Sequence, residues 1–245
     1  MTTTPARKLF ALAIGDARNA GRDTTLLPLL LAPLLLIVVV RYGVPPLAEL
    51  LQMRLDFDLM AFSDLISYLA SSITPFLFGI MFGFLLLEER EQGIIAVISI
   101  TPLTKRGYIA YKLVAPTVLS LCASLLVGTT IRLGVPAWST FLASRSLSAL
   151  LAPLIALVLA TYADNRVEGL ALAKALGLLL LAPAIVYFAP APWRYITLLV
   201  PTAWPAQIAF TAASPASMIG WSVAGAVVHG ALLHLLARRF QRGVG

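Results

Sequence analysis

The sequence is poor in the residue types from which catalytic and metal sites are built. Its 245 residues include one cysteine, two histidines and 11 acidic residues. The single cysteine, Cys122, excludes an intrachain disulfide and a cysteine-based metal site, and in its apolar setting it is expected to be a small buried side chain. No glycine is followed by lysine, so the P-loop that binds nucleotide phosphates is missing. These absences predict a chain with no catalytic residue, no metal site and no cofactor of its own.

Charged residues are also scarce, whereas apolar residues are in excess. They make up 12% and 60% of the chain, and the mean hydropathy is +0.91. Soluble domains are roughly 45–50% apolar and about 25% charged, so the surplus apolar surface must face lipid. A crossing needs about 20 helical residues. The predicted fold is an all-α polytopic membrane protein with six transmembrane helices, at about residues 24–42, 65–87, 108–133, 147–163, 170–189 and 216–237.

The basic residues indicate the orientation of these helices. The formal charge of +7 comes from Lys and Arg beside the apolar segments, so topology explains it better than nucleic-acid binding. Cytoplasmic loops carry an excess of Lys and Arg. With both termini in the cytoplasm, the inner side holds 13 of the 18 basic residues: Arg7, Lys8, Arg18, Arg22, Arg90, Lys105, Arg106, Lys112, Arg166, Lys174, Arg238, Arg239 and Arg242.

Two segments outside the spans have an unusual composition. Residues 1–23 precede the transmembrane domain of residues 24–245, and residues 6–22 predict an amphipathic helix in the membrane interface. The basic residues of this segment are Arg7, Lys8, Arg18 and Arg22. Residues 190–215 are apolar and aromatic but contain five prolines. This second segment is therefore predicted to form short helices or a re-entrant piece at the outer interface, before the last span.

Residues 88–107, between the second and third spans, are the most informative segment. Glu88, Glu89, Arg90 and Glu91 follow directly on the apolar span, and Gly93 allows a turn. A short apolar run from Ile94 and Ile95 to Ile100 is then broken by Pro102. The run is too short to cross a membrane, so it needs another surface, from the same chain or from a partner, to bury it.

This pattern resembles the coupling segment of permease subunits in type-2 ATP-binding-cassette (ABC) exporters. The similarity lies in Glu-Glu-Arg-Glu-x-Gly, the apolar run, and Thr-Pro-Leu with a basic residue before the next span. An N-terminal elbow helix, six spans and an outer Pro-rich insertion also resemble that family, which includes small drug and fluoroquinolone export permeases. Residues 200–204, Val-Pro-Thr-Ala-Trp, stand where the family often has Asn-Pro-Leu-Thr-Tyr.

The resemblance implies a function and partners. The chain would be the permease subunit of an exporter in a bacterial inner membrane, moving a hydrophobic or amphipathic drug, antibiotic or lipid. Separate ATPase subunits would bind ATP and Mg, and a second permease, identical or paralogous, would complete the pathway. The segment around Gly93 would dock on the ATPase, and Glu88, Glu89 and Glu91 would link it to the basic elbow helix.

Two other classes of protein compete with this interpretation. A secondary transporter driven by an ion gradient usually has acidic residues at the centre of its spans, which this sequence lacks. A membrane-embedded enzyme needs clustered reactive side chains, and the two histidines, His229 and His234, point about 140° apart on a helix. A Gly-x-x-x-Gly pattern at Gly79 and Gly83 is suited to close helix packing, within the chain or in a dimer.

Overall fold

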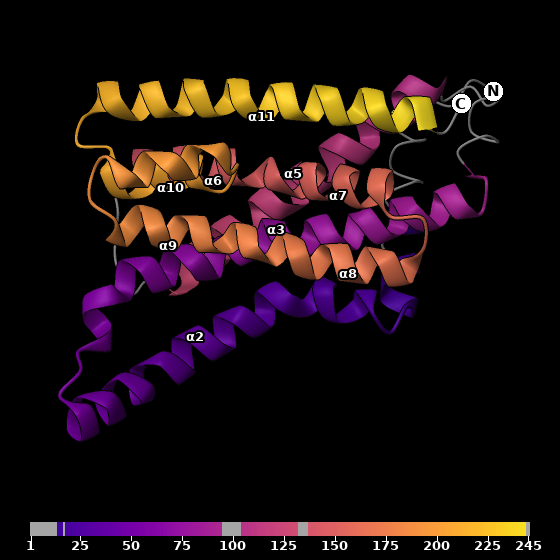
Figure 1. The fold of residues 1–245 in the computed structure, drawn as a ribbon. Helices are drawn as coiled ribbons and strands as arrows, with labels where there is room; N and C mark the ends of the chain where they lie inside the picture. Colours follow the sequence, from indigo (N-terminus) through magenta and orange to yellow (C-terminus); the bar gives the residue numbers. More distant parts are fainter. Residues whose placement is uncertain (1–13, 17, 95–103, 132–136, 244–245) are drawn as a thin grey trace.

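The computed structural model describes residues 14–16, 18–94, 104–131 and 137–243. Within these ranges the chain is helical and contains no strand. Six helical units have the length and hydropathy to cross a membrane, which confirms the predicted fold class. They are arranged side by side as a bundle (Figure 1).

The spans are built from the following elements. The first is α2, Leu26–Leu55, followed by the short η1, Leu59–Phe62, and the long α3, Ser63–Glu91. The third span is α5, Thr104–Ile131, and the fourth joins α6, Trp138–Ala149, to α7, Leu151–Tyr162. The fifth joins α8, Arg166–Leu176, η2, Gly177–Leu180, and α9, Leu181–Phe188. Then come η3, Trp193–Leu199, α10, Ala203–Thr211, and the last span α11, Pro215–Gly243.

Prolines interrupt the helices of the fourth and fifth spans. Each proline leaves the carbonyl four residues before it without its helical partner, and a hydroxyl from elsewhere in the chain binds that carbonyl instead. Pro153 cannot donate to the carbonyl of Ala149, where α6 gives way to α7. That carbonyl accepts a hydrogen bond from Ser120 Oγ of α5 at 3.2 Å. Pro183 likewise frees the carbonyl of Leu179, which accepts from Thr202 Oγ1. Such replacement bonds permit proline in a helix that has no water around it.

The second and fourth spans form the centre of the bundle. The apolar window of α3 is 83% buried, whereas those of α2 and α11 are 11% buried. Gly79 and Gly83 let α3 approach α7, since a Cβ on Gly79 would lie 2.7 Å from Ile155 Cβ. The Gly-x-x-x-Gly pattern therefore packs inside the chain.

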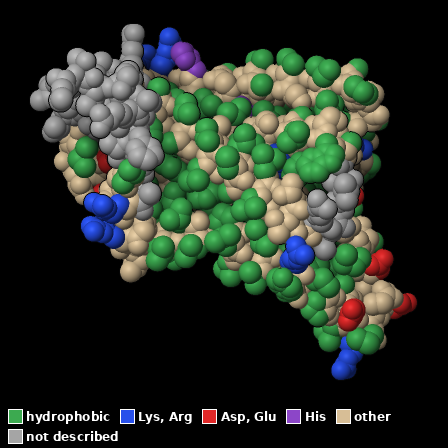
Figure 2. Space-filling model, turned by 180° about the vertical axis from the view of Figure 1, so that it is seen from behind, with side chains coloured by type: hydrophobic (Ala, Val, Ile, Leu, Met, Phe, Trp, Pro, Cys, Tyr) green, Lys and Arg blue, Asp and Glu red, His purple; other side chains and the backbone are tan. Residues whose placement is uncertain are grey.

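The outermost helices, α2 and α11, lie on opposite sides of the bundle, and α2 diverges from the other helices toward its C-terminal end (Figure 1). Many large apolar side chains of α2 are exposed, among them Leu35 and Met53. Figure 2 shows hydrophobic side chains across the middle of one face, with most of its Lys and Arg toward the ends. This distribution is that of a membrane protein, in which lipid covers the apolar band.

Three sequence-based expectations need correction. The first helix continues past residue 42 to Leu55 through Pro45 and Pro46, and Cys122 is exposed on α5. The fourth span begins at Trp138, nine residues before the predicted start. Arg145, one of the five basic residues not assigned to the inner side, therefore lies inside a span rather than in an outer loop. The weak hydropathy of residues 138–146 hid this part of the helix.

Candidate functional site

The most extensive group of charged contacts lies where α3 ends. Sequence reasoning placed Glu88 to Glu91 just beyond the span, but these residues form the last turn of α3. Gly93 follows with φ +68°, a left-handed conformation that glycine adopts without strain. Ile94 is exposed. Ile95 and Pro102 belong to the range 95–103, which lies outside the described residues.

Arg90 fastens the end of α3 to the end of α7. Its guanidinium donates hydrogen bonds to the carbonyls of Ala160 at 2.7 Å and Ala163 at 2.5 Å. The last carbonyls of a helix have no partner within the helix, and the planar fork of arginine suits two of them at once. Asp164 adds a weaker ion pair at 3.7 Å. Arg90 thus ties the end of α3 directly to the end of the central helix α7.

A second link joins α3 to α5 and to the N-terminal helical segment. Lys112 Nζ lies 2.8 Å from Glu89 Oε1 and 3.0 Å from both carboxylate oxygens of Asp16. The Lys112 side chain is only 3% exposed. One buried ammonium thus lies between two carboxylates, an arrangement that is stable only when the geometry is good and further hydrogen bonds are made.

Two tyrosines of α5 supply those hydrogen bonds. The hydroxyl of Tyr108 donates to Glu89, and that of Tyr111 donates to Asp16 at 3.0 Å. Lys112 also lies 5.6 Å and 5.7 Å from the centroids of the two tyrosine rings. Positions 108, 111 and 112 share one face of the α5 helix. We call these five residues, Asp16, Glu89, Tyr108, Tyr111 and Lys112, the ionic cluster.

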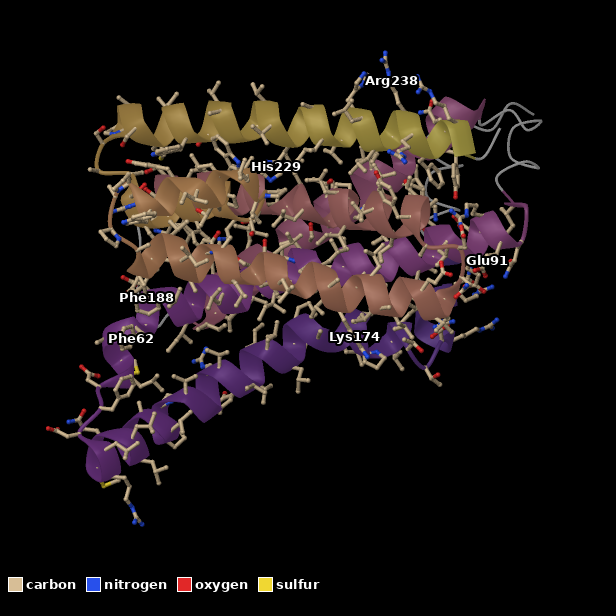
Figure 3. The ribbon with its side chains drawn as sticks, in the orientation of Figure 1. Phe62, Glu91, Lys174, Phe188, His229 and Arg238 are labelled. Carbon is tan, nitrogen blue, oxygen red and sulfur yellow. The ribbon has the colours of Figure 1, made fainter. Side chains whose placement is uncertain are left out.

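The ionic cluster connects the two ends of residues 88–107. Glu89 precedes this segment's turn and Tyr108 follows its last residue, so the chain leaves and re-enters the bundle at neighbouring points. Figure 3 places Glu91 at the end of the bundle opposite Phe62 and Phe188. Both ends of residues 88–107 therefore start from the same place, where α3, α5 and the N-terminal helical segment are held together by the ionic cluster.

Of the four predicted elbow residues, the structure describes Arg18 and Arg22. Residues 14–16 and 18–22 are helical, but Arg18 and Arg22 are exposed, and within the described ranges neither forms an ion pair with α3. The acidic Asp16 makes the contact instead, through Lys112. Arg7 and Lys8 lie outside the described residues. The acidic partners also differ, since Glu88 is exposed and bonds Gln92 at 3.0 Å, and Glu91 is exposed.

Another ion pair joins the starts of α2 and α8 at the same end of the bundle. Asp23 accepts two hydrogen bonds from Arg166, both 2.8 Å, and also accepts the backbone N–H groups of Thr25 and Leu26. Desolvation raises the pKa of the Asp23 carboxyl, but the bonds from Arg166 and the backbone outweigh this and lower the pKa below its usual value. A carboxylate at a helix N-terminus is stabilised in the same direction by the helix dipole.

The structure describes both histidines, and they are not close partners on α11. His229 is fully buried and its Nδ1 lies 2.7 Å from the Gly225 carbonyl, whereas His234 is exposed. Among the described residues, no three of His, Cys, Asp and Glu gather as a metal site would require.

Sequence reasoning singled out Glu89 as a link to the basic elbow residues, whereas its contacts in the structure are with Lys112 and Tyr108 of α5. Asp16, Tyr108 and Tyr111 were not among the candidate residues, and Lys112 was counted only among the basic residues of the inner side. The available signal was the spacing Tyr108, Tyr111, Lys112 at the start of a span, which puts three polar groups on one helix face.

Comparison with known proteins covers nearly the whole chain. A family model described as "Fluoroquinolones export permease protein Rv2686c-like" matches residues 16–237. Two relatives from Mycobacterium tuberculosis are each 28% identical over 240 residues, which is 96% of this chain and 94% of the relative. They are the fluoroquinolones export permease proteins MT2760, of strain CDC 1551 / Oshkosh, and Rv2686c, of strain ATCC 25618 / H37Rv. No solved structure matches the chain.

Proposed function

The chain belongs to the Rv2686c-like family of fluoroquinolones export permeases, and on that premise we propose that it is the membrane subunit of an ATP-driven drug exporter. Its cargo is an amphipathic drug of the class named for its relatives. ATP and Mg bind to separate ATPase subunits, and a second permease, identical or paralogous, completes the pathway. The protein resides in a bacterial inner membrane with both termini in the cytoplasm.

The ionic cluster is the observation that carries the ATP-driven mechanism. A force applied to the segment that follows α3 acts on the last turn of α3, from which Arg90 connects to the end of α7 and Glu89 connects to Lys112 of α5. Because α3 and α7 form the packed centre of the bundle, displacement of their ends changes the arrangement of the whole transmembrane domain. Packed helices respond to such a force by moving as rigid units between discrete arrangements.

The charge distribution supports the proposed orientation. The end that carries the ionic cluster also carries Arg90 in the last turn of α3, Arg166 beside Asp23, and Arg238 with the adjacent Arg239 of α11 (Figure 3). A basic end of this kind faces the cytoplasm. In this orientation residues 88–107 are accessible to a cytoplasmic ATPase, and α10 with η3 lies near the outer end.

Transport into inverted membrane vesicles tests this function. Vesicles containing the chain together with its candidate ATPase are expected to accumulate norfloxacin with ATP but not with a non-hydrolysable analogue. Glu89→Gln is expected to reduce the ATP-driven rate about tenfold or more, because the coupling segment loses its charged attachment. Lys174→Met serves as the control, since Lys174 is an exposed basic residue of the same half of the bundle and forms no ion pair with a described residue.

An ion-gradient-driven transporter is the second candidate function. It is favoured by His229, a fully buried titratable side chain within a span whose Nε2 has no hydrogen-bond partner. Buried ionisable groups in spans commonly belong to ion pathways. Uptake that follows an imposed pH gradient without ATP, and that stops in His229→Asn, would establish this second function and overturn the first.

A further inference from the structure

Arg145 is a charged side chain buried within a transmembrane span. It is the eighth residue of the span Trp138–Tyr162, and it is 3% exposed. At a rise of about 1.5 Å per residue, its Cα lies roughly 10 Å from the start of the helix. Burying a cation there is costly, so an ionisable residue at this depth points to a functional site.

The protein itself satisfies Arg145 incompletely. Its Nη1 donates to Ser72 Oγ at 3.2 Å and to the Tyr68 carbonyl at 3.4 Å, and its Nε has no partner. The rings of Tyr68 and Phe141 lie 4.4 Å and 5.8 Å from the guanidinium carbon. None of the ion pairs among the described residues involves Arg145. A buried guanidinium with free N–H donors and no counter-charge is prepared to bind an anion.

Arg145 lines a cavity between α3, α5, α6 and α10. The cavity has a volume of about 80 Å³, and its walls combine aromatic rings, Tyr68, Phe141 and Phe210, with the hydroxyls of Ser67, Ser71 and Ser144. Ser67 Oγ is buried without a hydrogen-bond partner. Drug-sized ligands occupy about 300 Å³ or more, so this arrangement accommodates one polar group of a larger molecule, and the remainder requires the helices to part.

The polar residues on α3 follow the helical repeat. Asp64, Ser67, Tyr68, Ser71 and Ser72 are spaced 3, 4, 7 and 8 residues from the first, which places them on one helix face. Asp64 is exposed and also borders the cavity. The cavity therefore presents one negative group, Asp64, at its edge and one positive group, Arg145, in its interior. This charge balance disfavours a dianion and suits a single carboxylate, alone or as part of a zwitterion.

We propose that Arg145 binds the carboxylate of the exported compound, and that the aromatic walls beside it bind the attached ring system. The guanidinium forms two parallel hydrogen bonds with a carboxylate, a geometry that lysine cannot reproduce. The proposal rests on the proposed function for the identity of its cargo. Binding itself needs neither ATP nor a partner, so it is tested separately from the energy source.

Equilibrium binding of norfloxacin and of its methyl ester measures the contribution of the carboxylate. The protein is purified in lipid nanodiscs, with any subunit that remains bound, and studied without nucleotide. The acid is expected to bind about 10–100-fold more tightly than the ester. Equal affinities for the acid and the ester would overturn the proposal, and this comparison requires no variant.

Variants assign the preference to Arg145. Arg145→Gln is expected to reduce the affinity for the acid to that for the ester, and Arg145→Lys to recover only part of the difference. Arg194→Gln is the control, since Arg194 is an arginine outside the cavity whose Nε also lacks a partner. If Arg145→Gln keeps the preference for the acid, the carboxylate binds elsewhere. If Asp64→Asn abolishes acid binding, Asp64 organises the site and Arg145 is its structural partner, which also overturns the proposal.

Discussion

Replacing Lys112 by methionine removes the one cation of the ionic cluster and leaves Asp16 and Glu89 buried beside each other. At separations of 2.8 Å and 3.0 Å, each ion pair has a Coulomb energy of about 5–6 kcal/mol at an effective dielectric constant of 20. Desolvation offsets most of that attraction in the intact cluster. Removing one partner of a buried pair costs about 3–5 kcal/mol, which for a chain of this length lowers Tm by about 6–20 °C.

Tryptophan fluorescence during heating measures this change, because the chain contains four tryptophans. Lys174→Met is the matched control and is expected to shift Tm by about 2 °C or less, as for most surface substitutions. The triple variant Asp16→Asn, Glu89→Gln, Lys112→Met is expected to recover most of the lost stability, since neutral groups can replace a buried ionic group.

Transport by the triple variant separates stability from coupling. A protein that is stable again but remains defective in ATP-driven export indicates that the charged contacts transmit force. A Tm for Lys112→Met within about 2 °C of the unaltered protein would refute the reasoning, because the cluster would then contribute nothing to the attachment of α5.

Three further predictions concern other parts of the same end of the bundle and its core. Gly79→Ala should lower the free energy of unfolding by about 1–3 kcal/mol, since the new Cβ would lie 2.7 Å from Ile155 Cβ. Gly220→Ala, whose Cβ would have no atom within 4 Å, should be neutral or stabilising. Equal Tm values for the two variants would contradict the close packing at Gly79. Gly93→Ala should reduce ATP-driven transport because the backbone angle φ of +68° at this position strains alanine. Gly93→Asn should retain more activity, since asparagine tolerates this conformation. The ratio of the two transport rates tests this prediction. Asp23→Asn should lower Tm at pH 7, because a carboxylate with a lowered folded-state pKa stabilises the protein while it is ionised. The Tm difference should shrink as the pH falls below the usual Asp value of 3.8 and through the lower folded-state pKa; a difference that does not change with pH would argue against the Arg166 ion pair.

Hydropathy alone determined the number of spans and the helical fold class, because the cost of unpaired backbone groups in lipid permits only helices or closed barrels. It located both ends of α3 and α5, and the start of α11, within about four residues, but it placed the end of α11 too early. It failed at α2 and α6. The predicted first span ended at residue 42, whereas α2 continues through Pro45 and Pro46 to Leu55; a transmembrane helix tolerates proline when other groups bind the freed carbonyls.

The candidate site was predictable only in outline. The charged run ending at Glu91 and the glycine at position 93 were visible as a turn between spans, because their spacing is local. The partners of Glu89 were not visible, since Asp16 and Lys112 are 73 and 23 residues away in the chain, and electrostatic pairing over such distances depends on how the helices pack.

The sequence by itself determined that this chain crosses a membrane six times and that most of its charged residues lie near the ends of the spans. These properties follow from composition and from the length of each apolar run. Only the tertiary structure decided which charges are buried together. Asp16, Glu89 and Lys112 are the charged members of the ionic cluster. Arg145 lies beside a cavity and forms no ion pair with another described residue. Both arrangements arise because three-dimensional packing brings distant helix faces into contact and excludes water from them.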